Sequence, residues 1–106
     1  MGLSVADAPV FGALGDPNRL RMVIALCEDG PSPTSALSRM LPSTRQAATK
    51  HLEVLSAAGV VTSARRGRER IWAVRPESLT GLADQLRVLS RRWDARLDRL
   101  RDYVED

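Results

Sequence analysis

The feature that most constrains the fold is an apolar stripe along the last third of this 106-residue chain. Between residues 78 and 104, apolar side chains recur at alternating spacings of three and four, as they do along one face of a helix. A helix of that length measures about 40 Å at 1.5 Å per residue. The stripe consists of Leu79, Leu82, Leu86, Leu89, Trp93, Leu97, Leu100 and Val104.

The part of the chain before this helix, roughly 75 residues, is too small a body to cover the whole stripe. The first half, Leu79 to Leu89, is also explained if it covers the protein's own core. For Trp93 to Val104 we favour a second copy of the same helix, because identical stripes bury each other along a two-fold axis. The pattern therefore predicts a homodimer.

Length and composition predict one soluble domain over residues 1–106. The hydrophobic fraction of 43% and charged fraction of 27% are ordinary for a globular protein. No apolar run is long enough for a membrane span, and the N-terminus lacks the pattern of a signal peptide. Cys27 is the only cysteine, so no internal disulfide can form. These features favour a cytoplasmic protein that does not contact membranes.

The net charge of +3 is confined to the middle of the chain. Residues 39–75 carry eight basic and two acidic side chains, whereas residues 1–38 and 76–106 are both slightly acidic. A basic patch on an otherwise balanced protein is typical of a polyanion partner, although a solvated basic face has the same composition. The motifs around the patch decide between the two.

Val10, Phe11 and Leu14 predict a short first helix, and cap residues mark the starts of the next two helices. Asp16 followed by proline predicts a helix start, and Ser32 with Pro33 repeats that signal. Leu20, Val23, Ile24 and Cys27 then predict a buried stripe, with Cys27 as a small core residue. Ala36, Leu37, Met40 and Leu41 predict a short third helix.

A fourth helix follows after a tight turn. Ser43 and Gln46 match a capping box at its start, and Gly59 is placed to end it in the left-handed conformation. Ala48, Leu52 and Leu55 are expected to point inward, with Gln46, Thr49, Lys50 and Glu53 on the opposite face. Residues 60–74 then alternate as a β-hairpin around the turn formed by residues 65–68.

A short helix, a turn, a capped polar helix and a hairpin are the elements of a winged helix-turn-helix. In that arrangement the start of the second helix reads base edges in the major groove, and the hairpin, or wing, lies on the DNA backbone. We predict base-edge contacts from Thr44, Arg45, Gln46 and Thr49, with Ser43 beside them and Lys50 on a phosphate. We predict phosphate contacts from Arg65, Arg66, Arg68 and Arg70, of which Arg70 is the weakest because it alternates with Ile71.

Three segments, in this order, resemble the ArsR/SmtB family of small dimeric bacterial repressors. Residues 13–21 (ALGDPNRLR) are similar to the family's ALxDPTRLR, and residues 43–61 to its SxxxVSxHLxxLxxAGLV. Residues 65–74 (RRGRERIWAV) are similar to its RREGRxxYY wing. The resemblance extends from about Phe11 to Val104.

The resemblance implies an α-α-α-α-β-β-α homodimer that represses transcription from a palindromic operator until an inducer lowers its affinity for DNA. It implies a helix-turn-helix over about 33–58 and a wing over 60–75. It also implies dimerisation helices over about 8–14 and 78–104. The implied interface residues are Val10, Phe11, Leu14, Leu86, Leu89, Trp93, Leu97 and Leu100.

The metal sites known in this family are missing from the sequence. The thiol-based class has a CVCDL-like motif where residues 33–37 read PTSAL. The zinc class has His with Asp or Glu on the last helix, where residues 78–106 contain no His. Zinc prefers nitrogen and sulfur ligands, so aspartates alone make a poor selective site. We therefore expect no cofactor and no metal, and the sequence does not identify an inducer.

Two other functions remain open. One is a metal-responsive regulator with an unusual carboxylate site, built from Asp94 and Asp98 across the dimer seam. The other is a winged-helix adaptor that binds proteins and has lost DNA binding, which the basic wing argues against. An enzyme is excluded by the residues available, because His51 and Cys27 are each the only one of their kind. We expect His51 to be structural, and both tryptophans to lie in the core or an interface, with Trp93 alternatively lining a ligand cavity at the seam.

Overall fold

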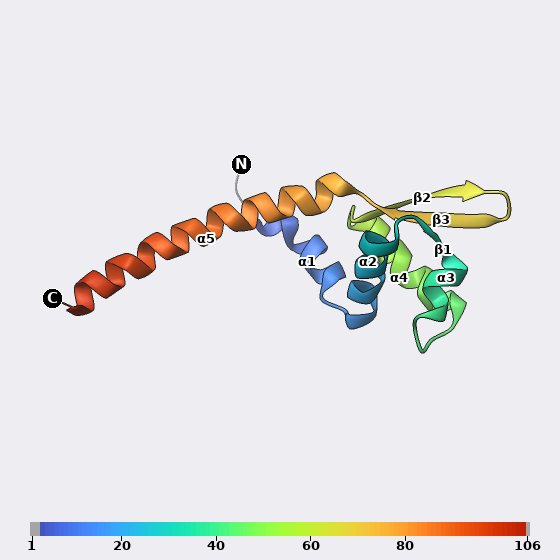
Figure 1. The fold of residues 1–106 in the computed structure, drawn as a ribbon, viewed down its shortest axis with the longest axis horizontal. Helices are drawn as coiled ribbons and strands as arrows, with labels where there is room; N and C mark the ends of the chain where they lie inside the picture. The colour runs from blue at the N-terminus through green and yellow to red at the C-terminus, as the bar shows by residue number, and fades with distance from the viewer. Residues whose placement is uncertain (1–2, 106) are drawn as a thin grey trace.

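Residues 3–105 of the computed structural model form a helical head with a small sheet, and one long helix that extends away from it (Figure 1). A single 3-10 turn (Val5–Asp7) leads into the first helix. The helices are α1 (Ala8–Leu14), α2 (Pro17–Asp29), α3 (Thr34–Arg39), α4 (Arg45–Ala57) and α5 (Pro76–Glu105). The strands are β1 (Ser32–Pro33), β2 (Val61–Arg66) and β3 (Glu69–Val74). This confirms the predicted mainly helical winged helix-turn-helix class.

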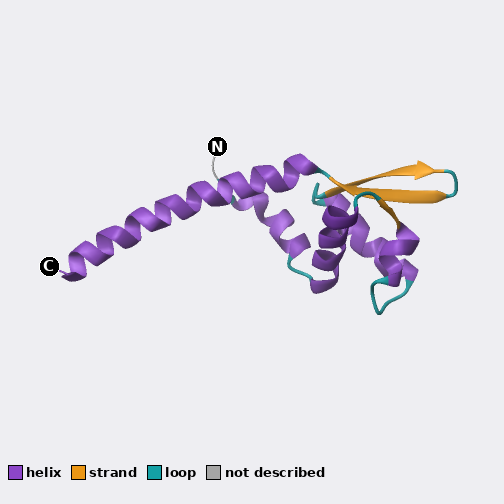
Figure 2. Cartoon of the chain, in the orientation of Figure 1, coloured by secondary structure: helices purple, strands orange, loops and turns teal. Residues whose placement is uncertain are grey.

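The buried core of the head is formed by side chains from α1, α2, α3, α4 and the base of the hairpin. Figure 2 shows these elements gathered around one another. Side chains from each of these elements are fully or almost fully buried there. Because one core joins all of them, the hairpin is anchored at its base to the same body as α3 and α4. The largest fully buried side chains are Trp72, Met22, Leu37, Leu52, Leu55, Val60 and Val61.

The sheet has three antiparallel strands in the order β1-β3-β2. The third strand was not predicted: Ser32 and Pro33 pair with Trp72 and Ile71. The prediction that Ser32 caps the next helix is therefore wrong. The N-cap of α3 is Pro33, which provides no capping side chain, and the Ser32 hydroxyl instead donates to the carbonyl of Gly30 at 2.9 Å.

The start of α2 is as predicted, but its buried face is not. The Asp16 carboxylate caps the helix, accepting from the backbone N–H groups of Asn18 and Arg19 at 2.9 and 3.0 Å. The core side chains of α2 are Met22, Val23 and Leu26. Consequently the predicted stripe holds only for Val23, while Leu20 and Ile24 are 43% and 47% exposed and Cys27 is exposed. The helix is rotated about its axis so that Met22 replaces Leu20 in the core.

The end of α4 is as predicted, and its start differs by one residue. Gly59 has φ +82°, and the N–H groups of Gly59 and Val60 donate to the carbonyls of Ser56 and Leu55, both at 3.0 Å. These two bonds form a Schellman motif, which requires the left-handed glycine. At the start, the N-cap is Thr44, whose hydroxyl accepts from Ala47 N–H at 3.1 Å. The predicted capping box of Ser43 and Gln46 is therefore wrong.

The last helix, α5, is continuous over 30 residues and has no buried residue. Near its start Leu79 packs against the core of the head, and the next turns of α5 lie beside Asp7 and Val10. The C-terminal part of the helix projects away from the body (Figure 1). The molecule is consequently 67 Å long and only 28 by 24 Å across. None of the helices within residues 3–105 combines the length and apolarity that crossing a membrane requires.

Candidate nucleic-acid interface

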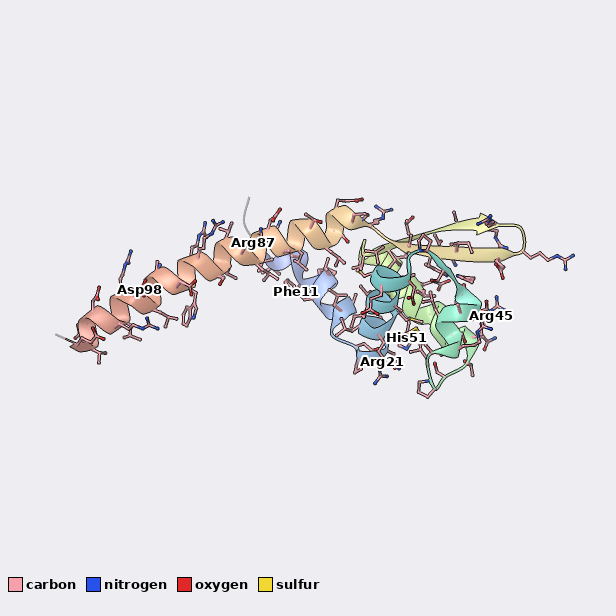
Figure 3. All side chains as sticks on the ribbon, viewed as in Figure 1. Phe11, Arg21, Arg45, His51, Arg87 and Asp98 are labelled. Carbon is pink, nitrogen blue, oxygen red and sulfur yellow. The ribbon has the colours of Figure 1, made fainter. Side chains whose placement is uncertain are left out.

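The start of α4 lies at the end of the molecule opposite the tip of α5. Figure 3 shows Arg45 at this end, with Asp98 far away on α5. Packing of α4 against α3 on one side leaves its N-terminal turn in solvent. Ser43, Thr44, Arg45, Gln46 and Lys50 are all exposed, as expected of residues that contact DNA. The inward residues Ala48, Leu52 and Leu55 are completely buried, so the helix is fixed in its rotation.

Two of the predicted base-reading residues use their hydroxyl groups within the protein. The Thr44 hydroxyl caps α4, and the Thr49 hydroxyl donates to the carbonyl of Arg45 at 3.0 Å. A hydroxyl that already donates to a backbone carbonyl has no proton left for a base. Thr49 can therefore offer a base edge its methyl group and a lone pair, and Arg45 and Gln46 are left as the strongest candidates for specific hydrogen bonds.

The wing ends in a two-residue turn formed by Gly67 and Arg68. Gly67 has φ +65°, and Arg68 does not share the positive φ, which is the pattern of a type II′ hairpin turn. The strands extend further than the sequence predicted, because Arg65 and Arg66 belong to β2 and pair with Arg70 and Glu69. Arg65, Arg66 and Arg68 are exposed at or near the tip. Among residues 3–105, no carboxylate lies within ion-pair distance of these three.

Arg70 lies differently from the other wing arginines. Its guanidinium lies over the indole ring of Trp72, with its central carbon 4.1 Å from the ring centroid. Its Nε donates to the Ser63 hydroxyl at 2.9 Å, and one of its terminal nitrogens is 3.7 Å from the carboxylate of Glu53. The side chain is therefore held against the body of the head.

Arg19 and Thr34 have structural roles that the sequence did not reveal. Arg19 donates to the carbonyl of Ala13 at 2.8 Å, at the end of α1, and lies 3.4 Å from His51 Nδ1 on α4. Thr34 is 5% exposed and accepts a 2.8 Å hydrogen bond from the indole N–H of Trp72. Both residues join segments far apart in the sequence, for which no local pattern exists. His51 is half-buried in the first of these contacts, in keeping with a structural role.

The carboxylate of Asp16 also belongs to this contact between α1, α2 and α4. It lies 4.0 Å from His51 Nδ1. Chiefly because it accepts the backbone N–H of Arg19, and also because of the charge on Arg19, the pKa of Asp16 is lowered from its ordinary value of 3.8. The charge on Asp16 therefore stabilises the start of α2.

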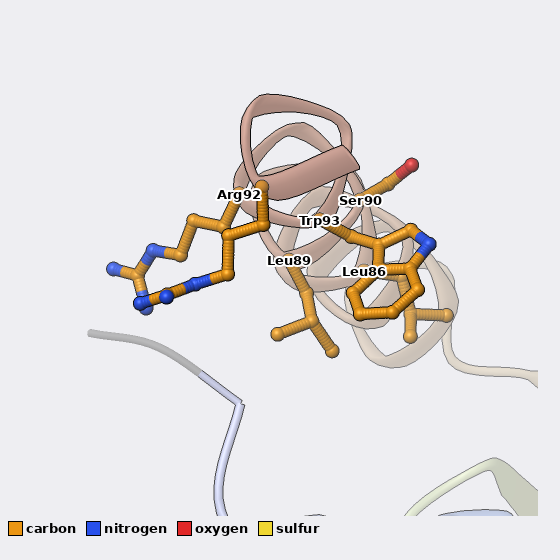
Figure 4. Close-up of a pocket in the computed structure, with 6 residues that line it drawn as sticks. Leu86, Leu89, Ser90, Arg92 and Trp93 are labelled. Carbon is orange, nitrogen blue, oxygen red and sulfur yellow. The ribbon is translucent and has the colours of Figure 1, made fainter. Parts of the chain in front are cut away.

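The apolar residues expected at a dimer seam lie on α1 and α5. Val10 and Leu14 pack partly against the protein's own core, whereas Phe11 is 40% exposed. Leu86, Leu89 and Trp93 lie on one side of α5 (Figure 4) and form an apolar surface that is open to solvent. Trp93 is 62% exposed. Leu100 further along is also exposed, and Leu97 is half-exposed.

Side chains that could bind a metal ion lie apart from one another. Within residues 3–105, no three His, Cys, Asp or Glu side chains come together as a metal site would require. Asp94 and Asp98 both lie exposed on α5. In one protomer, therefore, they have no third ligand beside them.

Known proteins resemble this chain in both sequence and fold. A family described as "Helix-turn-helix domain" matches residues 14–64. YuzN of Bacillus subtilis (strain 168), named an uncharacterized HTH-type transcriptional regulator, is 38% identical over an alignment of 79 residues that covers 69% of this chain and 86% of YuzN. The structure of an ArsR-like transcriptional regulator from Rhodococcus sp. RHA1 matches with a TM-score of 0.77 and 35% identity, covering 90% of this chain and 89% of that one.

A third similarity concerns the fold alone. Mb0332 from Mycobacterium bovis was solved as a homodimeric winged helix-turn-helix DNA-binding domain, fragment 1–100. It matches with a TM-score of 0.66 and 22% identity, over 81% of this chain and 79% of that one.

The fold, together with the exposed start of α4 and the basic wing, is that of a winged helix-turn-helix transcriptional regulator. The relatives are regulators rather than enzymes. Within that class, the chain belongs to the ArsR family.

Proposed function

We propose that the protein is a homodimeric repressor that binds an inverted-repeat operator and does not respond to metal ions. The observation that carries this proposal is the placement of two surfaces at opposite ends of one molecule. The polar start of α4 and the basic wing lie at one end, and the uncovered apolar face of α5 lies at the other. A second copy joined through α5 would give two reading heads related by a two-fold axis.

Each head is proposed to read one half-site. Arg45 and Gln46 would donate to base edges, guanine suiting arginine and adenine suiting glutamine. Lys50 and the wing arginines Arg65, Arg66 and Arg68 would neutralise phosphates. The two half-sites would lie about 10–10.5 base pairs apart or at a multiple of that spacing.

The dimer is supported by the exposed residues Leu86, Leu89 and Trp93 on α5, and Phe11 of α1 is a further exposed apolar residue available to the proposed interface. Mb0332, which has the same fold, is homodimeric. Because the partner is chromosomal DNA, we place the protein in the cytoplasm. Any inducer would act by binding better to the arrangement of the two heads that does not fit DNA.

A selection from random duplex DNA tests this proposal. The purified protein should enrich an inverted repeat, bind it as a dimer, and lose affinity steeply as salt rises. Micromolar zinc added to the complex should leave binding unchanged. Release by zinc would instead reveal a metal site across the seam, for which Asp94 and Asp98 are the candidates.

Substitution of the reading residues tests whether the protein binds DNA specifically at all. Arg45→Ala and Gln46→Ala should each weaken binding to the selected sequence by about 1–3 kcal/mol. Binding to unrelated duplex DNA should change much less. If no sequence is enriched and neither substitution matters, the head is a protein-binding adaptor.

A further inference from the structure

Arg70 occupies a place in the wing that differs in kind from those of Arg65, Arg66 and Arg68. In the register of the hairpin it lies directly across from Arg65. Like charges at directly opposed positions of two strands repel each other. Here the repulsion is relieved because Arg70 turns toward the head, where Trp72, Ser63 and Glu53 hold it. Arg65 is thereby left free in solvent.

The contacts of Arg70 join three elements of the reading head. Ser63 lies on β2, Trp72 on β3 and Glu53 on the outer face of α4. Among the ion pairs within residues 3–105, the one between Arg70 and Glu53 is the only link between the wing and α4. The same network extends to α3, because Thr34 accepts from the Trp72 indole at 2.8 Å and donates to the Arg70 carbonyl at 3.4 Å.

The positive charge of Arg70 lies beside a carboxylate. The carboxylate 3.7 Å from it belongs to Glu53, an exposed residue on the face of α4 predicted to approach DNA. A free carboxylate on that face would repel phosphates. Arg70 thus offsets part of the charge of Glu53, whereas Arg65, Arg66 and Arg68 keep their charge for the backbone of the DNA.

The sequence alone groups Arg70 with the phosphate-contacting residues of the wing, and its surroundings favour a different role. Building on the proposed function, we propose that Arg70 is a positioning residue. It fixes the angle between the wing and α4, and so determines which phosphates the wing reaches while α4 is in the major groove. Its side chain does not itself contact DNA.

Salt dependence separates a positioning residue from a phosphate contact. Arg70→Gln is compared with Arg65→Gln, its partner across the hairpin, on the duplex selected by the wild-type protein. Losing one phosphate contact per protomer should reduce the slope of log K against log salt by about 1.8 per dimer, at about 0.9 per contact. We expect that change for Arg65→Gln and an unchanged slope for Arg70→Gln. An equal fall in slope for both variants would overturn the proposal.

Hydroxyl-radical footprinting gives the positive evidence. Arg70→Gln should keep the protection at the centre of each half-site and lose or shift the flanking protection made by the wing. Glu53→Gln should do the same, although it keeps Arg70 and its charge, so its effect cannot come from a lost phosphate contact. Flanking protection that both variants retain would overturn the proposal.

Two controls keep these results separate from failures of another kind. Thermal unfolding followed by circular dichroism establishes that each variant is folded, and Glu53→Gln changes only an exposed side chain. If the wild-type protein enriches no duplex, the proposed function has failed. A wild-type protein that binds normally, with Arg70 variants behaving like Arg65 variants, refutes the positioning role alone.

Discussion

The head and α5 of this molecule differ in how far they bury their apolar side chains. In the head, side chains such as Met22, Leu52 and Leu55 are completely buried within a single chain. In α5, none of 30 residues is buried. The two tryptophans show the contrast directly, since Trp72 is fully buried and Trp93 is 62% exposed.

This difference shows that an apolar stripe on a helix becomes part of a core only where another apolar surface covers it. The head closes its core because its helices are short and turn back on one another, so each apolar face meets another from the same chain. The apolar face of α5 extends beyond the body after the turns around Gly81 and Leu82, which lie beside Asp7 and Val10. From Leu86 onward its apolar side chains are largely exposed. In a single molecule, therefore, the head buries its apolar side chains, whereas the apolar face of α5 stays exposed to solvent.

The largest effect that tests this comparison is expected from Trp72→Ala. Removing a buried tryptophan should lower the free energy of unfolding by about 3–5 kcal/mol, and Thr34 would lose its indole partner. Urea unfolding followed by circular dichroism measures the change.

Trp93→Ala is the matched substitution on α5. Its effect should act through the dimer, and so depend on protein concentration. Equal losses for both variants at every concentration would contradict the division of the molecule into a head that buries its apolar side chains and a helix that leaves them exposed.

Leu89→Asp should break the proposed seam. Burial of a leucine contributes about 1.5–3 kcal/mol, and a two-fold interface contains the residue twice. Together with a carboxylate placed in an apolar contact, this should weaken dimerisation at least a hundredfold, at about 1.4 kcal/mol per factor of ten. Sedimentation equilibrium measures it.

The control for this substitution is the adjacent residue. Val88 is 38% exposed and lies off the stripe, so Val88→Asp should leave the dimer intact. A dimer that tolerates Leu89→Asp, or that is disrupted equally by both variants, would place the interface elsewhere.

A smaller effect distinguishes the observed cap of α4 from the predicted one. Thr44→Ala should cost about 1 kcal/mol because Ala47 loses its hydrogen-bond acceptor. Ser43→Ala should cost almost nothing. Chemical denaturation of the two variants decides between them, and the reverse order would restore the capping box.

The smallest effect concerns pH. The pKa of Asp16 is lowered in the folded state. Its charge therefore stabilises the fold at pH values above the ordinary pKa of 3.8, and this stabilisation is lost as the pH falls through the lower pKa of the folded state. Asn caps a helix nearly as well but does not titrate. The stability advantage of wild type over Asp16→Asn should therefore shrink between pH 7 and pH 3; an advantage independent of pH would contradict this assignment.

Sequence patterns predicted the parts of this fold that depend on neighbours in the chain. Asp16 before proline, Gly59 after an amphipathic helix, and a glycine between two alternating runs each determine a local conformation. The class of fold followed from the order of these elements. The exposure of Arg45, Gln46 and the wing tip followed as well, because the opposite faces carry the core.

What the sequence missed depends on distant contacts. The pairing of Ser32 with Trp72 forms a strand too short to have a pattern of its own. The rotation of α2 was mispredicted because Leu20, Ile24 and Cys27 form as good a stripe as Met22, Val23 and Leu26, and only the packed neighbours choose between them. Likewise the inward turn of Arg70 depends on Glu53, which precedes it by a whole strand.

The Schellman ending of α4 has a consequence for regulation. Val60 donates the hydrogen bond that ends the helix and is itself fully buried, and β2 begins at the next residue. No flexible residue separates the two elements, so α4 and the base of the wing form one rigid unit. The role proposed for Arg70 concerns the part of the wing beyond that base. In the proposed dimer, the adjustable quantity would then be the angle between the two protomers. Over a protomer 67 Å long, a small rotation at the dimer interface would become a large displacement at the DNA.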